Sequence, residues 1–259
     1  MSDLSFQPIR TRSRWFLGFD CATKTFAFSL SRVDFDGIKT NCEVFKKRAS
    51  LCLEVKRRID DLVAAGDIEA ASQLLDSLAP IVAGLDSESK EFIRIVDGET
   101  VDLFPGQADS DVVTVDRLRA VARYVADRVR PSLEVIPPDE SLCVMVEFQM
   151  GPNAKARAVA SALIALFAEN DVIIVGPTLK NKVSVGDGGH YGSFASKYSS
   201  SYAANKAHAK FNFAKFEELF GSSVPPCAPS LRGHIADSFM QVIGHLMFGG
   251  SDDDARRRF

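Results

Sequence analysis

The stretch RWFLGFDCATKTFAFSLSRVDFDG, residues 14–37, decides the fold. It contains two apolar runs of strand length that are separated by a short polar turn, and Asp36-Gly37 adds a second turn signal. Asp20 ends the first run, where burying an isolated carboxylate would be costly. The stretch therefore predicts a β-hairpin whose first strand carries a functional acid, although Asp20 could also simply belong to the turn.

The segments that follow predict an α/β fold with a mixed central sheet flanked by helices. The segment 38–50 suits a third strand, which would complete an antiparallel meander before parallel strands begin. Thr114 is the expected N-cap of the first helix after the insertion described below. Helices are expected at 114–129, 153–170, 203–220 and 233–248, and buried strands at 142–148 and 171–177.

The 259 residues suit one large domain that carries an insertion. The insertion is expected at about 51–110, acidic, helical at first and irregular over 88–106. A flexible leader is expected at 1–13, and a charged tail at 251–259. The core domain then spans 14–250, apart from the insertion.

Composition favours an intracellular protein in a reducing compartment. The chain is 46% hydrophobic with a net charge of -3, and its five cysteines form no C-x-x-C pair. Its longest apolar run, 158–168, is about half of the roughly 20 residues that a membrane span needs. No secretory leader opens the chain, so neither secretion nor membrane insertion is expected.

Charge is distributed unevenly. Residues 178–216 contain six lysines against Asp187 alone, whereas residues 60–111 are strongly acidic. A basic stretch could follow a phosphate backbone, although it could also be an ordinary solvated surface. The lysines considered for DNA binding are Lys24, Lys180, Lys182, Lys197, Lys206 and Lys210.

Three acids lie at the ends of apolar elements: Asp20, Glu147 after VMV, and Asp237 in the last helix. His234 precedes Asp237 by three residues and therefore shares its helix face. Carboxylate oxygens suit Mg²⁺, and Mn²⁺ is expected to substitute. Such a cluster can hold two ions roughly 3.5–4 Å apart. Alternatively, Glu147 could reach solvent, and His234 with Asp237 could be a polar pair at a helix N-terminus.

The motifs FLGFDCATKTFAFSL, VMVEFQ and HIAD, in this order, resemble the RNase H-like superfamily and, within it, the RuvC-type Holliday-junction resolvases. The E-x-Q of Glu147 and Gln149 is most similar to the poxvirus and mitochondrial branch. The resemblance covers about 14–48 and 114–248, and it suggests a viral source, for which the location would be the host cytoplasm or nucleus.

This resemblance implies an RNase H-like fold and a homodimeric, Mg²⁺-dependent endonuclease that cleaves four-way DNA junctions. Asp20, Glu147, His234 and Asp237 match the catalytic metal-binding positions, and Gln149 joins the lysines as a DNA-binding residue. One departure is that family members commonly carry D-x-G at the first acid, whereas this chain has Ala22 in place of the glycine.

Three other functions stay open. A related nuclease could act on other branched DNA or on an RNA–DNA hybrid, and a silent module of this fold could only bind. A sugar-kinase or actin-like ATPase would explain the D-x-x-T-K-T of Asp20–Thr25 and the glycine-rich 185–190 as phosphate loops. That fold normally needs two such domains, however, and does not explain H-x-x-D in the last helix.

Overall fold

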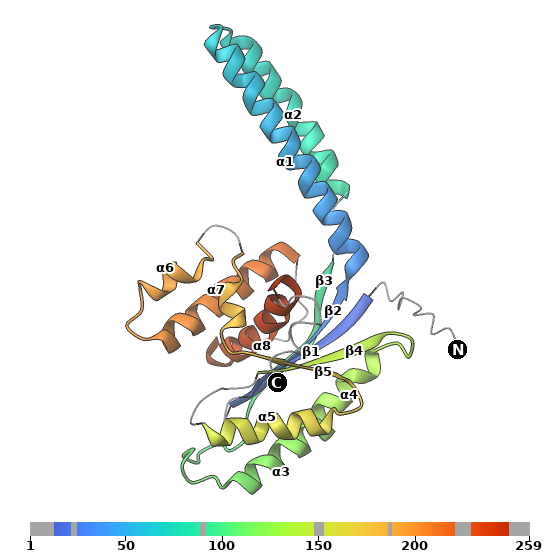
Figure 1. Cartoon of the computed structure of the whole chain (residues 1–259), viewed down its shortest axis with the longest axis vertical. Coiled ribbons are helices and arrows are strands. Elements are labelled where there is room, and N and C mark those ends of the chain that lie inside the picture. The colour runs from blue at the N-terminus through green and yellow to red at the C-terminus, as the bar shows by residue number, and fades with distance from the viewer. Residues whose placement is uncertain are drawn as a thin grey trace, which may run out of the picture. The chain divides into compact units, whose positions relative to one another are not determined.

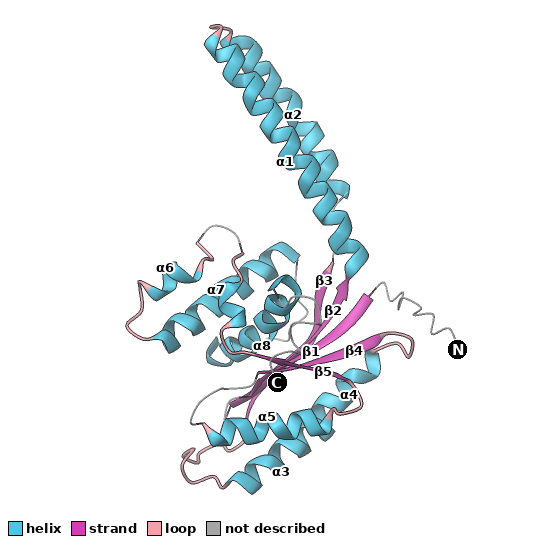
Figure 2. Cartoon of the chain, viewed as in Figure 1, coloured by secondary structure: helices cyan, strands magenta, loops and turns pink. Residues whose placement is uncertain are grey.

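The computed structural model describes residues 13–21, 25–88, 92–147, 153–185, 188–220 and 229–248. The protein is α/β, with a five-stranded mixed sheet that is flanked by helices (Figure 1; Figure 2). The predicted fold class is confirmed at this level.

The sheet has the strand order β3-β2-β1-β4-β5. β4 is parallel to both β1 and β5, whereas β3 runs antiparallel to β2. An antiparallel part is thus followed by parallel strands, as the sequence predicted. The strands are β1 (Ser13–Cys21), β2 (Thr25–Asp34), β3 (Ile93–Asp102), β4 (Ser141–Glu147) and β5 (Asp171–Val175).

Helices cover both faces of the sheet. One face is covered by α3 (Thr114–Tyr124) and α5 (Ala154–Leu166), and the other by α8 (Pro229–Phe248) with α7 (Ser201–Phe220) behind it (Figure 2). The remaining helical elements are α1 (Phe35–Ala64), α2 (Ile68–Glu88), η1 (Val125–Val129), α4 (Arg130–Ser132), η2 (Leu133–Val135), η3 (Leu179–Lys182) and α6 (Tyr191–Ala195).

Strand alternation sorts the side chains of β1 and β4 between these two faces. Leu17 and Phe19 of β1 join Val144 and Val146 of β4 in the core beneath α3 and α5. The intervening positions, which include Asp20 and Glu147, therefore face α8. Since Phe19 pairs with Val146, Asp20 and Glu147 follow at the same level of adjacent parallel strands.

Helix α8 lies directly against β1 because Gly18 has no side chain. A Cβ at Gly18 would lie 2.5 Å from the Ser238 carbonyl oxygen and 3.1 Å from Val242. The helix is buried between the sheet and the neighbouring elements from Ile235 to Gly244. This close approach brings the polar residues of α8 over the end of β1.

The predicted third strand at 38–50 is wrong. These residues belong to helix α1, which begins after Asp34, whose carboxylate accepts the Asp36 backbone N–H at 2.9 Å. This N-cap makes the DFDG segment start a helix instead of a turn. The third strand is β3, in the region that was predicted to be irregular, and its burial alternates at Ile93 and Ile95.

The insertion therefore spans residues 34–92 instead of the predicted 51–110. Residues 34–92 form a compact unit in which α1 and α2 pack together as a helical hairpin. The Asp34 backbone N–H donates to the Phe92 carbonyl at 2.8 Å, so the chain enters and leaves the hairpin at one point.

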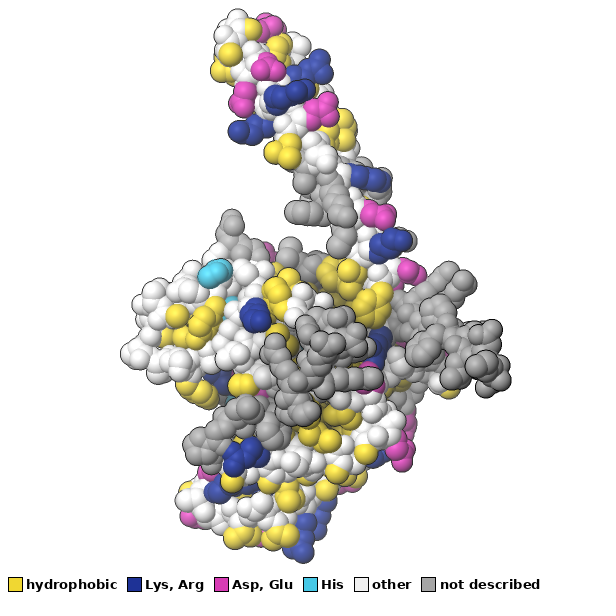
Figure 3. All heavy atoms as spheres, viewed as in Figure 1, with side chains coloured by type: hydrophobic (Ala, Val, Ile, Leu, Met, Phe, Trp, Pro, Cys, Tyr) yellow, Lys and Arg dark blue, Asp and Glu magenta, His cyan; other side chains and the backbone are white. Residues whose placement is uncertain are grey.

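The surface of the hairpin is not uniformly acidic. Figure 3 shows both charge signs on it, with hydrophobic side chains between them. Helix α1 contains the basic run Lys56, Arg57 and Arg58, whereas α2 has acids and no lysine or arginine. Among the hairpin side chains that the structure describes, the exposed large hydrophobic ones are Phe35, Leu53, Val63, Ile68, Leu75 and Ile81.

Smaller differences concern element ends and burial. The N-cap of α3 is Val113, and Thr114 is the first helical residue. The predicted helix 114–129 continues beyond Tyr124 as the π-helical turn η1. Strand β5 was predicted to be buried, but it is mostly part-exposed, because it is the edge strand of the sheet that the structure describes and pairs with β4 alone.

The predicted helices at 153–170, 203–220 and 233–248 are confirmed as α5, α7 and α8, with shifted ends. The predicted tail 251–259 and all of the leader 1–13 except Ser13 lie outside the described residues. Among the helices that the structure describes, none is long and apolar enough to cross a membrane.

Substituting Gly18→Ala should lower the free energy of unfolding by about 1–3 kcal/mol, because the new methyl group would collide with the backbone of α8. Denaturant unfolding without metal measures this change. Gly176→Ala is the control, since a Cβ there meets nothing within 4 Å, and it should stay within about 0.5 kcal/mol of the wild type. Equal effects of the two substitutions would contradict the role of Gly18.

Replacing residues 34–92 by Asn-Gly should leave the rest of the chain folded. Val33 pairs with Ile93, and Asn-Gly is a favoured two-residue turn between antiparallel strands. We expect one cooperative thermal transition within about 5 °C of that of the core in the full chain, followed by circular dichroism. A molten, non-cooperative product would show that the core needs the hairpin.

Candidate active site

Three acids converge between the carboxyl ends of β1 and β4 and the helix α8. Asp20 is 5% exposed, Glu147 is 4% exposed and Asp237 is 1% exposed. Strand alternation directs the first two toward α8, and the close packing at Gly18 brings the third toward them. The predicted convergence of residues that are distant in sequence is present in the structure.

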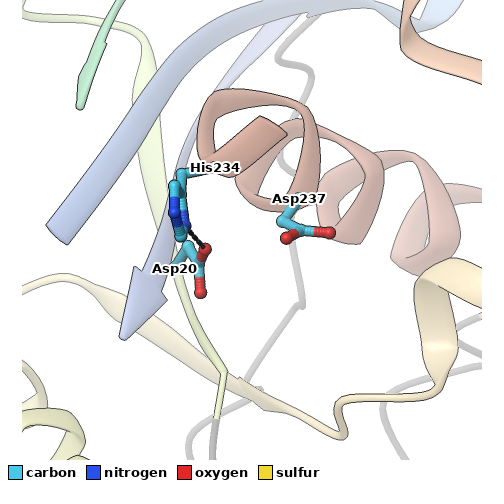
Figure 4. Close-up of side chains that lie close together, drawn as sticks. All are labelled: Asp20, His234 and Asp237. Carbon is cyan, nitrogen blue, oxygen red and sulfur yellow. Dashed lines mark hydrogen bonds and ion pairs between the residues drawn. The ribbon is translucent and has the colours of Figure 1, made fainter. Parts of the chain in front are cut away.

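His234 completes the cluster with Asp20 and Asp237 (Figure 4). Its Nδ1 lies 2.8 Å from Asp20 Oδ2, and in the tautomer protonated at Nδ1 the imidazole donates this hydrogen bond, because an ionised carboxylate can only accept. One ligand atom from each of the three residues can be chosen so that all lie within 4.8 Å of one another. His234 and Asp237 share this site because three residues span almost one helical turn.

Two lysine ammonium groups lie among the acids. Lys180 Nζ lies 3.2 Å from both Glu147 Oε2 and Asp237 Oδ1, and its side chain is only 8% exposed. Lys206 Nζ lies 3.4 Å from Asp20 Oδ2 and forms a second ion pair with Asp237 Oδ2. Buried carboxylates are tolerated only with such partners or with a metal ion, so the lysines supply the local counter-charge.

The site makes the two strand acids electrostatically different. Burial would raise the pKa of Asp20, but the hydrogen bond from His234 and the charges of Lys206 and Lys180 outweigh it and lower this pKa. Burial also raises the pKa of Glu147, and Lys180 only partly offsets this effect because Asp20 and Asp237 repel a further negative charge. Adjacent positions in the sheet thus carry acids of opposite pKa shift.

The pKa values of both ammonium groups are raised. Burial would lower the pKa of Lys180, but Asp237, Glu147 and Asp20 more than compensate. Burial would likewise lower the pKa of Lys206, but the negative charges of Asp20 and Asp237 outweigh this effect and raise it. Both lysines therefore stay protonated at neutral pH and act as fixed positive charges.

The cluster opens into a pocket of about 190 Å³. Helix α7 forms one wall with Tyr202, Asn205 and Lys206, while Pro177 and Lys180 come from the segment after β5. Tyr202 is exposed at this wall. The pocket has space for a small hydrated ion or a phosphate group beside the acids.

Lys180 and Lys206, which the sequence suggested as contacts to a DNA backbone, lie inside the site and form ion pairs with its acids. Lys182, Lys197 and Lys210 are exposed and remain available for a phosphate backbone. The other two predicted DNA-binding residues, Lys24 and Gln149, lie outside the described residues.

Two further residues of the site, Gln241 and Asn205, are not among those predicted from the sequence. The Gln241 amide donates to Glu147 Oε2 from a fully buried position, and Asn205 accepts a hydrogen bond from Asn181 at 3.0 Å, which ties α7 to η3. The signal for Gln241 is an amide four residues after Asp237, in the mostly apolar part of the helix that follows this acid. Asn205 had no comparable signal, because its role depends on the packing of α7.

The donor set fits a divalent cation. Mg²⁺ and Mn²⁺ prefer carboxylate oxygens, can accept an imidazole nitrogen, and retain water in the remaining positions. Asp20, His234 and Asp237 would hold the ion, and Glu147 borders the same pocket.

Comparison with known protein families and with curated protein sequences finds no match to this chain.

Substituting Glu147→Gln should stabilise the metal-free protein increasingly as pH rises. The pKa of Glu147 is raised above 4.5, so its favourable contribution to folding is present when it is protonated and is lost as pH rises from 4.5 through the folded-state pKa. Glutamine imitates the protonated acid at every pH. When unfolding free energies are measured from pH 4 to pH 8, those of variant and wild type should therefore begin to diverge as pH rises above 4.5.

Glu169→Gln, an exposed position on the same chain, controls for general charge effects. Its difference from the wild type should change little over this range. If the stability difference between Glu147→Gln and the wild type does not depend on pH, the raised pKa of Glu147 is contradicted.

Proposed function

We propose that this protein is a divalent-metal-dependent endonuclease with an RNase H-like fold, and that it cleaves four-way DNA junctions by hydrolysis of phosphodiester bonds. The strand order and the mixed sheet are compatible with this fold. The finer assignment rests on the motifs of Asp20, Glu147 and His234-x-x-Asp237, which resemble those of the RuvC-type resolvases.

One observation carries the proposal: acids from β1, β4 and α8 gather with His234 around one pocket. A structural ion-pair network would need the acids and lysines, but it would not need an open pocket beside them. Nor would it need a half-buried imidazole whose ring contacts a carboxylate at the pocket wall. These features favour a site that receives a ligand.

The residues of the site have distinct roles in this proposal. Bound divalent ions would activate a water and stabilise the leaving oxygen of the phosphodiester. Asp20 and Asp237 would bind the metal through their carboxylate oxygens. Lys180 forms ion pairs with both Glu147 and Asp237 and so fixes their relative position. His234 orients the Asp20 carboxylate, and its imidazole can bind metal or transfer a proton.

The exposed Lys182, Lys197 and Lys210 provide contacts to the sugar–phosphate backbone outside the pocket. Such contacts position DNA without reading its sequence, and they make affinity fall steeply with salt. The exposed ring of Tyr202 lies at the pocket, where a flat side chain can support a sugar or a base.

The preference for a four-way junction and the homodimer both come from the resemblance. A junction has two-fold symmetry, so paired incisions require two active sites with the same symmetry. A flap, a linear duplex, an RNA–DNA hybrid and ATP, each with and without Mg²⁺, test the other substrate classes. Cleavage of another nucleic acid would change the substrate, whereas ATP hydrolysis alone would favour the kinase-like alternative.

Substituting Asp20→Asn or Asp237→Asn should lower Mg²⁺-dependent cleavage of a labelled four-way junction by about a hundredfold or more, because each removes a metal-binding charge. Junction binding, measured by gel shift in Ca²⁺, should stay close to that of the wild type. Asp171→Asn, which changes an exposed acid on β5, should cleave normally. If a site variant cuts at the normal rate, that acid does not bind the catalytic metal.

A further inference from the structure

Lys206 occupies a particular place in the cluster. Its Nζ lies 3.4 Å from Asp20 Oδ2 and 3.3 Å from His234 Nδ1, and it forms an ion pair with Asp237 Oδ2. These are the same three residues whose ligand atoms lie within 4.8 Å of one another. One ammonium group therefore contacts every member of the candidate metal-binding set.

We propose that the Lys206 ammonium is an internal counter-ion that stands where a divalent cation binds, and that metal binding requires it to leave. This inference rests on the proposed metal site but not on the identity of the substrate. It makes Lys206 a residue that sets metal affinity, and assigns it no contact with the reacting phosphate.

The electrostatics of the site require a cation at this position at all times. Asp20 and Asp237 are buried, and buried carboxylates without a compensating charge would be strongly destabilising. The Lys206 ammonium satisfies both acids in the absence of metal, so the site is formed before an ion arrives. A divalent ion in the same place would be repelled by an ammonium that remained there.

Lys206, rather than Lys180, is the lysine able to leave. Both lysines line the open pocket, but the Lys206 side chain is 21% exposed, whereas the Lys180 side chain is 8% exposed and held between Glu147 and Asp237. The four-carbon stem of a lysine allows its ammonium to swing toward solvent without movement of α7.

Charge balance points to the same exchange. The three acids and two ammonium groups leave one net negative charge, if the imidazole is counted as neutral. Adding one divalent ion without loss of a lysine would make the buried site positive. Exchanging the Lys206 ammonium for one divalent ion makes it neutral, which is the cheaper state in a poorly solvated environment.

The test compares Mn²⁺ binding to the full-length wild type, Lys206→Met and Lys210→Met by isothermal titration calorimetry. Lys206→Met keeps the apolar stem and removes the competing charge, so we expect its dissociation constant to fall by about tenfold or more. Lys210 is exposed and lies one turn further along α7, so Lys210→Met should bind Mn²⁺ like the wild type. Equal or weaker binding by Lys206→Met would overturn the proposal.

Thermal unfolding of the same three proteins gives a second readout. Without metal, Lys206→Met should melt at a lower temperature than the wild type, because its acids lose their counter-charge. Mg²⁺ should raise its melting temperature by more than that of the wild type. A variant that folds only with Mg²⁺ also supports the exchange, whereas a loss of stability that Mg²⁺ does not recover contradicts it.

A third measurement uses the wild type and so does not depend on the variant being folded. The ¹⁵N resonance of the Lys206 ammonium should shift and lose its protection from hydrogen exchange when Mg²⁺ is added. An unchanged, protected resonance at saturating Mg²⁺ would show that the ammonium stays in place. If Mg²⁺ displaces the Lys206 ammonium but the protein has no nuclease activity, only the proposed function is contradicted. If none of the three proteins binds metal, both proposals are contradicted.

Discussion

The burial of three carboxylates in one small volume is the constraint on which this structure depends. Asp20, Glu147 and Asp237 are almost fully buried, and each would be prohibitive to bury alone. Two ammonium groups make the arrangement possible, yet the raised pKa of Glu147 shows that the compensation is incomplete. A buried acid with a raised pKa beside a pocket is typical of a functional site.

The sheet and the last helix solve the problem of bringing these acids together. Parallel pairing places the ends of β1 and β4 at one level, and strand alternation turns both acids toward α8. Gly18 then lets α8 approach closely enough for His234 and Asp237 to reach Asp20. The position of the site is therefore a consequence of strand register and helix packing, which bring the residues of the short motifs together.

The helical hairpin illustrates how a fold tolerates a large insertion. The chain leaves the sheet at the end of β2 and returns at the start of β3, with Asp34 and Phe92 joined by a backbone hydrogen bond. The pairing of β2 with β3 is thus the same as in a hairpin with a short turn. The sequence predicts a third strand before the insertion because DFDG is typical of a turn, whereas in the structure Asp34 acts as a helix N-cap.

The sequence by itself determined the α/β class, the strands β1 and β4 that carry two of the acids, and the residue types of the site, because apolar periodicity and acids at strand ends are local signals. It also indicated His234 with Asp237, since helical spacing puts them on one face. Only the tertiary structure decided that Lys180 and Lys206 belong among the acids, that Gln241 supports Glu147, and that β3 follows the hairpin. Charge partners and strand partners are chosen by contacts between distant segments, and no local pattern of residues specifies those contacts.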